Sequence, residues 1–223
     1  LVTVRVWDLP TRIFHWLLAA CVVAAWVSAQ IGGNAMVWHF RLGYAVVGLL
    51  VFRLVWGVVG GHWSRFATFI PSPMTLWRYV RGRTRPEEAL DVGHSPTAAL
   101  SVLAMLLVLL AQVATGLVAD DDLGNVGPLN RWVSGRTAAL ATSWHKGVGE
   151  PLILGLVLLH GAAIVFYAVV KRRQLVPPMI TGDKTDLPAA TPVSRDGLAQ
   201  RLLALALAAA VALGVTLLVR AGA

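Results

Sequence analysis

Apolar residues gather in five long runs along the chain, and polar and charged stretches separate these runs. A membrane-spanning helix needs about 20 consecutive, mainly apolar residues. Segments of this kind lie at residues 12–31, 40–59, 98–118, 145–170 and 199–219. The pattern therefore predicts an all-α integral membrane protein in which four transmembrane helices are followed by a polar linker and a fifth helix.

The composition supports this class, because 57% of the residues are hydrophobic and only 13% are charged. The net charge of +8 would suggest nucleic acid as a partner for a soluble domain, but in a membrane protein the position of the charges matters more. The stretches before the first span, between spans two and three and between spans four and five hold 13 Lys and Arg residues, whereas the alternate stretches hold 5. The positive-inside rule therefore predicts a multi-pass membrane protein with a cytoplasmic N-terminus, lipid around it and no nucleic-acid partner.

Four of the six histidines lie within or at the ends of the predicted spans, where an ionisable group suggests a function. His15 begins span one at its cytoplasmic end, and His39 and His145 begin spans two and four at their outer ends. His160 follows His145 by 15 residues, which corresponds to about 22 Å of depth and a rotation of only about 60° away from the same helix face. The depths predict two pairs, His39 with His145 on the outer side and His15 with His160 on the inner side.

Two imidazole pairs at different depths suit the irons of two non-covalent haem b groups, each with both axial positions filled. Zinc sites use three or four clustered ligands, so separated pairs do not favour zinc. The sequence has no C-x-x-C-H motif for covalent haem. We therefore predict a four-helix dihaem bundle over residues 1–175, a cytoplasmic linker over 176–198 and a fifth transmembrane helix over 199–219.

Arg53 lies deep within the second span, 14 residues after His39. This spacing places it about 21 Å deeper and within about 40° of the His39 face, which is level with the inner haem. A haem propionate would compensate its charge there. The alternative is a side chain that extends along the helix to the inner membrane surface.

With these residues in place, the chain resembles the bacterial cytochrome b561 family, which includes the b-type cytochrome subunits of nickel–iron hydrogenases. The stretches that carry the resemblance are VWDLPTRIFHW (6–16), WHFRLGY (38–44), GHSPTAALSVLAMLLVLLAQVATGL (93–117), WHKGVGE (144–150), LLHG (158–161) and MITGDK (179–184). The resemblance implies a four-helix haem bundle of the bacterial inner membrane that exchanges electrons with quinone and a redox partner. It also implies that His15, His39, His145 and His160 are the haem ligands, while the fifth span departs from the family's core.

His94 belongs to the GHSP stretch before span three and has no partner for a third haem. One hypothesis is that it binds a quinone head group or a propionate. The other is that it helps to shape the entry to the helix, where Ser95 can cap the first turn and Pro96 suits it.

We predict a carrier that transfers electrons across the bilayer between the quinone pool and a redox partner such as a periplasmic c-type cytochrome. The acidic run Asp120–Asp122 could attract a basic partner, or it could be a solvated loop. Three alternatives stay open: a haem-bearing membrane anchor of a hydrogenase-like complex, a stand-alone superoxide or metal oxidoreductase, and a haem-free transporter. Whether the chain also acts as a quinone oxidoreductase enzyme is not decided by these patterns.

Overall fold

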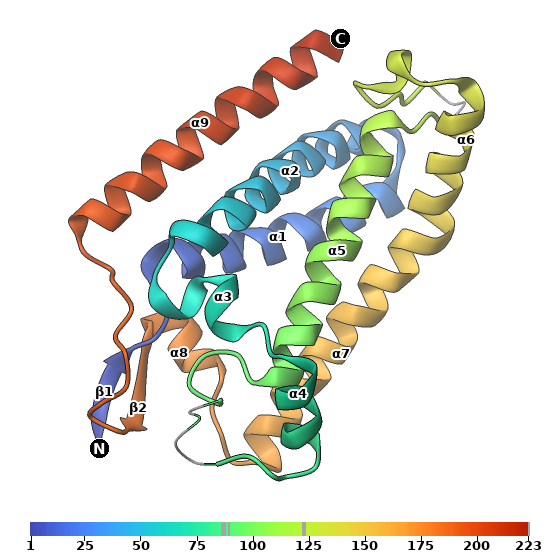
Figure 1. The fold of residues 1–223 in the computed structure, drawn as a ribbon. Helices are drawn as coiled ribbons and strands as arrows, with labels where there is room; N and C mark the ends of the chain where they lie inside the picture. Colours follow the sequence, from blue (N-terminus) through green and yellow to red (C-terminus); the bar gives the residue numbers. More distant parts are fainter. Residues whose placement is uncertain (86–87, 89, 122–123, 223) are drawn as a thin grey trace. The chain divides into compact units, whose positions relative to one another are not determined.

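The computed structural model describes residues 1–223 except 86–87, 89, 122–123 and 223 (Figure 1). Within the described residues, five helical stretches are long and apolar enough to cross a membrane. These stretches are α1 (Leu9–Ile31), Gly33–Val59 with η1 (Gly33–Ala35) and α2 (Met36–Val59), α5 (Pro96–Val118), Gly135–Val169, and α9 (Leu198–Gly222). The prediction of a largely α-helical membrane protein with five spans is confirmed.

Two helices begin earlier than their apolar runs because polar side chains cap them. The Asp8 carboxylate accepts a hydrogen bond from the Thr11 backbone N–H at 2.8 Å, so α1 begins at Leu9. The Ser95 hydroxyl accepts one from the Ala98 N–H at 3.3 Å, and Pro96 occupies the first position of α5. The predicted cap of the third span therefore forms.

The fourth span is longer than predicted and has three parts. They are α6 (Gly135–Trp144), a π-helix η5 (His145–Gly149), and α7 (Glu150–Val169). The sequence prediction began this span at residue 145, ten residues after the start of α6. Ser134 caps the earlier start by accepting the Thr137 N–H at 3.2 Å.

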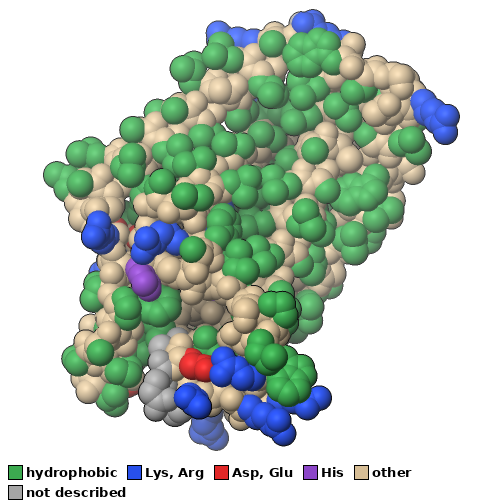
Figure 2. Space-filling view, viewed as in Figure 1, with side chains coloured by type: hydrophobic (Ala, Val, Ile, Leu, Met, Phe, Trp, Pro, Cys, Tyr) green, Lys and Arg blue, Asp and Glu red, His purple; other side chains and the backbone are tan. Residues whose placement is uncertain are grey.

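Large apolar side chains on the long helices are exposed rather than buried. Leu107 on α5, Leu158 on α7 and Leu205 on α9 each expose about two thirds or more of their surface. On the face seen in Figure 2, hydrophobic side chains cover the long helices, and Lys and Arg side chains gather beside α4 (Pro73–Val80). An apolar exterior of this extent fits a lipid environment.

The chain divides into two compact units, and each long helix contributes residues to both. Unit 1 contains Leu1–Ile13, Arg53–Ala104 and Leu158–Ala204. Unit 2 contains Phe14–Phe52, Met105–Val157 and Leu205–Ala223. Besides parts of the long helices, unit 1 contains β1 (Val2–Arg5), η2 (His62–Ser64), α3 (Phe66–Phe69), α4, α8 (Val176–Thr181) and β2 (Asp183–Leu187). Unit 2 contains η1, η4 (Asn130–Trp132), α6 and η5.

Unit 1 contains a two-stranded sheet that the sequence analysis did not predict. The strand β1 pairs antiparallel with β2, with Val4 opposite Lys184 (Figure 1). Residues 176–198 were predicted as a linker, but they include α8 and β2. The reason lies in Gly182, whose φ of 90° ends α8 and whose carbonyl accepts the Val6 and Trp7 N–H groups at 2.9 and 3.0 Å.

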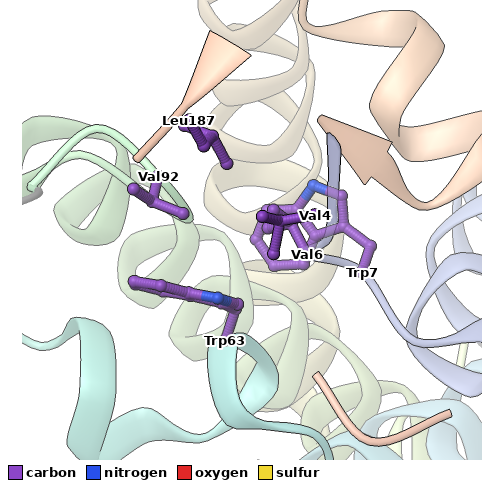
Figure 3. Close-up of a cluster of buried hydrophobic side chains, with 6 residues drawn as sticks. All are labelled: Val4, Val6, Trp7, Trp63, Val92 and Leu187. Carbon is purple, nitrogen blue, oxygen red and sulfur yellow. The ribbon is translucent and has the colours of Figure 1, made fainter. Parts of the chain in front are cut away.

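A small hydrophobic cluster stabilises this sheet. Its side chains come from β1 and the turn after it, η2, the stretch before α5 and β2, and Figure 3 shows them facing one another. The members are Val4, Val6, Trp7, Trp63, Val92 and Leu187. This cluster holds segments of unit 1 that lie far apart in the sequence.

Asp196 ties the start of the chain to the segment before α9. Its carboxylate, only 5% exposed, forms ion pairs with Arg5 at 2.7 Å and Arg201 at 3.2 Å, and it accepts the Leu9 N–H at 3.1 Å. Burial alone would raise the pKa of Asp196. The hydrogen bonds from Arg201, Leu9 and Arg5 outweigh burial and hold this pKa below its usual value.

Candidate functional site

His39 and His145 come together in unit 2. His39 lies on α2 and His145 is the first residue of the π-helix η5. Their ring centroids are 6.0 Å apart, and the ring planes are inclined at 84°. The structure therefore places in one site two of the four histidines singled out from the sequence.

Each of these imidazoles is oriented by a backbone carbonyl. The Nδ1 of His39 lies 2.8 Å from the Ala25 carbonyl oxygen on α1, and that of His145 lies 2.9 Å from the Gln112 carbonyl oxygen on α5. A carbonyl oxygen can only accept a hydrogen bond, so both Nδ1 atoms carry the proton. The lone pair of each ring then resides on Nε2, which is the arrangement typical of histidines that bind metal.

The separation of the rings matches two imidazoles that share one metal ion. Imidazole nitrogen binds a first-row metal at about 2.0–2.1 Å and lies about 1.1 Å from the ring centroid, so two opposed ligands have centroids about 6 Å apart. The observed 6.0 Å meets this requirement. Across the described residues, no group of three or more His, Cys, Asp or Glu side chains could hold a metal ion. The pair could therefore supply two ligands to a haem iron.

One side chain contacts the backbone of His145, and two others contact Glu150, which follows the π-helix. The Gln112 side-chain amide donates to the His145 carbonyl oxygen at 3.0 Å. Just after the π-helix, one Glu150 carboxylate oxygen accepts hydrogen bonds from the Trp26 indole at 3.0 Å and the Gln30 amide at 2.9 Å. π-Helical turns are rare and often occur at functional sites, which suits the placement of His145 here.

Two glycines lie on the helices that carry or contact the imidazole pair. A Cβ atom on Gly116 would lie 2.8 Å from Cε1 of His145, so a side chain at this position would collide with the ring. A Cβ atom on Gly43, four residues after His39, would meet no other described side chain within 4 Å. The His145 ring therefore packs directly against Gly116, whereas open space lies beside Gly43.

His15 and His160 lie in different units. His15 is on α1 within unit 2, and His160 is on α7 within unit 1. Their pairing follows only from the sequence spacing and stays a prediction.

Arg53, on α2 in unit 1, is buried with 3% of its surface exposed. Its guanidinium carbon lies 4.7 Å from the Phe66 ring centroid and 6.0 Å from that of Phe69. Within the described part of the chain, the buried Nη1 atom has no hydrogen-bond partner. A buried guanidinium nitrogen in this state can accommodate an anionic oxygen, as the propionate prediction requires.

His94 lies directly before the Ser95 cap of α5 and is enclosed by aromatic rings of unit 1. Its ring centroid is 4.7 Å from that of Trp7 and 4.6 Å from that of Phe69. It lines a cavity together with residues from η2, α3 and α4. His62, on η2, is half-buried, and its burial together with the charge of Arg65 lowers its pKa.

The acidic run of the loop after α5 is described for Asp120 and Asp121, while Asp122 lies outside the described residues. The Asp121 carboxylate accepts hydrogen bonds from the backbone N–H and side-chain amide of Asn125 at 3.0 and 2.7 Å. The backbone of Asp120 exchanges hydrogen bonds with the Thr142 hydroxyl, both at 2.9 Å. These contacts shape the loop itself.

The sequence analysis missed the residues that support the imidazole pair. Gln112 is an amide in the middle of an apolar span, and this polarity alone could have marked it as a residue in need of a partner. Gly116 follows it by four residues on the same helix face. Glu88, which lines the cavity beside His94, lies in a charged loop and has no distinguishing pattern around it.

The chain is similar to cytochrome subunits from several bacteria. A probable Ni/Fe-hydrogenase B-type cytochrome subunit from Bradyrhizobium diazoefficiens is 22% identical over 82% of this chain and 86% of its own length. A probable Ni/Fe-hydrogenase 1 B-type cytochrome subunit from Escherichia coli (strain K12) is 22% identical over 79% of this chain and 88% of its own length. A probable Ni/Fe-hydrogenase B-type cytochrome subunit from Azotobacter vinelandii is 26% identical over 80% of this chain and 87% of its own length. No solved structure is significantly similar. The family model for prokaryotic cytochrome b561 matches residues 6–182, most of the chain including all four histidines, and the chain therefore belongs to the prokaryotic cytochrome b561 family.

Proposed function

We propose that this chain is a membrane-bound dihaem b-type cytochrome that transfers electrons across the bilayer between the quinone pool and a redox partner. The observation that carries the proposal is the His39–His145 pair, whose ring centroids are 6.0 Å apart and whose Nδ1 atoms are both engaged by carbonyls. Haem b, when bound, supplies a reversible one-electron carrier. His39 and His145 would hold it through Nε2, while Ala25 and Gln112 keep both rings in the required tautomer.

A second haem b would be held by His15 and His160. The support is the spacing of 15 residues between His145 and His160, which separates the two sites by about 22 Å of helix. Arg53 would meet a propionate of this second group through its buried Nη1 atom. The Lys and Arg distribution supports a cytoplasmic N-terminus in the bacterial inner membrane.

Two kinds of redox partner are compatible with this role. A periplasmic c-type cytochrome would exchange electrons with the outer haem as a diffusing protein. The relatives from three bacteria are instead named as hydrogenase cytochrome subunits, which favours a stable complex with a larger redox enzyme. Purification from the native membrane distinguishes these cases, since a complex would retain an iron–sulfur subunit with the cytochrome in stoichiometric amount.

The proposal is tested by reducing the purified protein with dithionite and recording its absorption spectrum and haem content. We expect low-spin b haem at two groups per chain, because each of the two sites supplies both axial ligands. A colourless protein would contradict the function. A single haem per chain would contradict the second pair.

The glycine beside His145 yields a sharper test of the first site. Because a Cβ at Gly116 would lie 2.8 Å from the His145 ring, the Gly116→Ala variant must displace that ring. Overpacking costs about 1–3 kcal/mol, which corresponds to haem binding weaker by roughly 5- to 150-fold at this site. Titration of the haem-depleted protein with haem, followed by absorbance, measures this change. The matched control is Gly155→Ala on α7, where a Cβ meets nothing within 4 Å among the described atoms, and haem affinity should stay unchanged.

A further inference from the structure

Two arginine side chains lie against the same tryptophan at the end of α4. The guanidinium carbon of Arg81 is 4.2 Å from the Trp77 ring centroid, and that of Arg83 is 5.9 Å from it. All three residues are exposed. Among the residues that the structure describes, no carboxylate forms an ion pair with Arg81 or Arg83. Two cations therefore meet at one indole ring, and no described acidic side chain balances their charge.

The turn that ends α4 sets the positions of these arginines. Gly82 has a φ of 64°, and its N–H donates to the Tyr79 carbonyl oxygen at 3.0 Å. The Arg83 N–H donates to the Arg78 carbonyl oxygen at 2.9 Å. This pair of hydrogen bonds around a left-handed glycine ends many helices and turns the chain back. The turn places Arg83 beside Trp77, which belongs to the preceding helical turn.

One face of α4 is fixed to other parts of unit 1. The Arg78 Nη1 atom donates to Glu88 Oε1 at 2.7 Å, and the Tyr79 hydroxyl donates to Asp91 Oδ1 at 2.8 Å. These contacts involve the stretch between α4 and α5. They hold α4 in one orientation, so the side chains of its other face stay exposed.

That exposed face of α4 is mainly apolar. Met74, Trp77 and Val80 expose 63%, 45% and 69% of their surfaces. Trp77 follows Met74 by three residues and precedes Arg81 by four, so these side chains lie on one helix face. Apolar and aromatic side chains beside arginines are typical of a short helix that lies at a membrane interface.

The end of α7 adds further positive charge next to α4. Arg173 Nη1 donates to Asp91 Oδ2 at 2.8 Å, so one carboxylate joins this segment to Tyr79 of α4. Lys171 and Arg172 directly precede Arg173 and are exposed. Neither forms an ion pair with a described carboxylate. Figure 2 shows Lys and Arg side chains gathered in this part of the molecule.

This combination of charge and apolar surface fits a phospholipid better than a free anion. Guanidinium groups donate strong hydrogen bonds to phosphate oxygens. The exposed apolar side chains of α4 would contact the glycerol and acyl part of a lipid, which inorganic phosphate does not have. The helix also lies in the chain between α2 and α5, both long and apolar enough to cross a membrane, so a bilayer surface is close to it.

We propose that the end of α4 binds the head group of an anionic phospholipid. Arg81 and Arg83 donate to its phosphate oxygens, and Met74 and Trp77 contact its apolar part. Lys171 and Arg172 add to the attraction. This site concerns the lipid around the protein and does not depend on the proposed electron transfer.

Binding is tested by native mass spectrometry of the full-length protein in an uncharged detergent. The protein is titrated with phosphatidylglycerol or with phosphatidylcholine of the same acyl chains, and we expect tighter binding of phosphatidylglycerol. A basic residue at an anionic membrane surface contributes about fivefold in affinity, so the Arg81→Gln/Arg83→Gln variant should bind phosphatidylglycerol roughly 25-fold more weakly. Both residues are exposed, so the variant should keep the Tm of the parent protein.

A charge-matched variant separates a local site from an effect of net charge. Arg41→Gln/Arg136→Gln removes two exposed arginines from unit 2. Arg41 also lies over a tryptophan, 5.1 Å from the Trp38 ring centroid, but as a single cation. This control should bind phosphatidylglycerol like the parent protein. An equal loss of affinity in both double variants, or no loss in Arg81→Gln/Arg83→Gln, would overturn the proposal.

The turn at Gly82 provides a test that leaves both arginines in the sequence. Valine disfavours a positive φ, whereas asparagine tolerates it. Gly82→Val should displace Arg83 from Trp77 and weaken phosphatidylglycerol binding by about fivefold, the contribution of one basic residue. Gly82→Asn should bind like the parent protein. A Cβ atom at this position meets no described atom within 4 Å, so neither variant is overpacked, and equal affinities in the two would overturn the ordered site.

Competition with inorganic phosphate distinguishes a lipid site from a site for the free anion. Because phosphate lacks the apolar part that contacts Met74 and Trp77, a millimolar concentration should leave bound phosphatidylglycerol in place. Displacement of the lipid by phosphate would overturn the proposal in favour of a free-phosphate site. Haem content is measured on the same samples, so a loss of the proposed electron-transfer function would be seen separately from a loss of lipid binding.

Discussion

Replacing His145 with alanine is expected to halve the haem content of the purified protein, from two b haems per chain to one. The reason is that His39 and His145 share one site, in which each imidazole has its Nδ1 bound to a carbonyl and only Nε2 left for iron. Alanine removes one of the two imidazoles that we propose would hold the haem, and no group of three or more potential metal ligands exists among the described residues to replace it. The pyridine haemochrome assay, normalised to protein, measures the loss.

The reciprocal variant makes this test specific. His39→Ala should leave a residual spectrum and midpoint potential identical to those of His145→Ala, and the double variant should lose no more haem than either single one. His62→Ala removes a histidine of η2 outside the spans and should retain both haems. If the two single variants lose different haems, His39 and His145 do not bind the same haem, even if the parent protein contains two haems.

The sequence was sufficient to predict that His39 and His145 lie close together, because the position of a residue along a span determines its depth. The position of a histidine at the start of a predicted span determines its expected depth, and the predicted spans place His39 and His145 at the same membrane face. The same reasoning does not predict the contacts that orient the two imidazoles. The carbonyls of Ala25 and Gln112 carry no side-chain signal, and the π-helical turn at His145 depends on packing against neighbouring helices.

The part of the chain outside the spans was predicted least well, because contacts between distant residues determine it. The strand β2 has no strong alternation of apolar and polar residues and forms only because β1, about 180 residues earlier, pairs with it. Asp196 likewise meets Arg5 across a separation of 191 residues. A linker and a paired strand have similar composition here, so only the tertiary contacts distinguish them.

A second large effect is expected from Asp8, which was not singled out by the sequence analysis. Its carboxylate is fully buried in unit 1 and joins the start of α1 to the end of α2 and to η2. It accepts hydrogen bonds from the Thr11 N–H at 2.8 Å, the Trp56 indole at 3.1 Å, the Gly61 N–H at 3.0 Å and the Ser64 hydroxyl at 2.6 Å. One side chain therefore satisfies donors from three segments.

The Asp8→Ala variant should destabilise the protein strongly, because it leaves these buried donors without an acceptor. Removing one partner of a buried, charged hydrogen-bond network costs about 3–5 kcal/mol. For a chain of this length, such a loss lowers the apparent Tm by roughly 10 °C. Thermal unfolding of the protein in detergent, followed by circular dichroism, measures this shift.

A graded series distinguishes the network from a general effect of mutation. Asp8→Asn retains one acceptor oxygen but places an amide N–H against donors that the second oxygen had accepted. Its loss of stability should therefore fall between the losses caused by Asp8→Ala and by Trp56→Phe. Trp56→Phe removes a single donor and should cost only about 1 kcal/mol. Gly61→Ala should approach Asp8→Ala, because a Cβ atom there would collide with Asp8 Oδ2. Asp186→Asn, which changes an exposed carboxylate, is the control. If Asp8→Ala were as stable as this control, four buried donors would have lost their acceptor without cost, and the network would contribute nothing to stability.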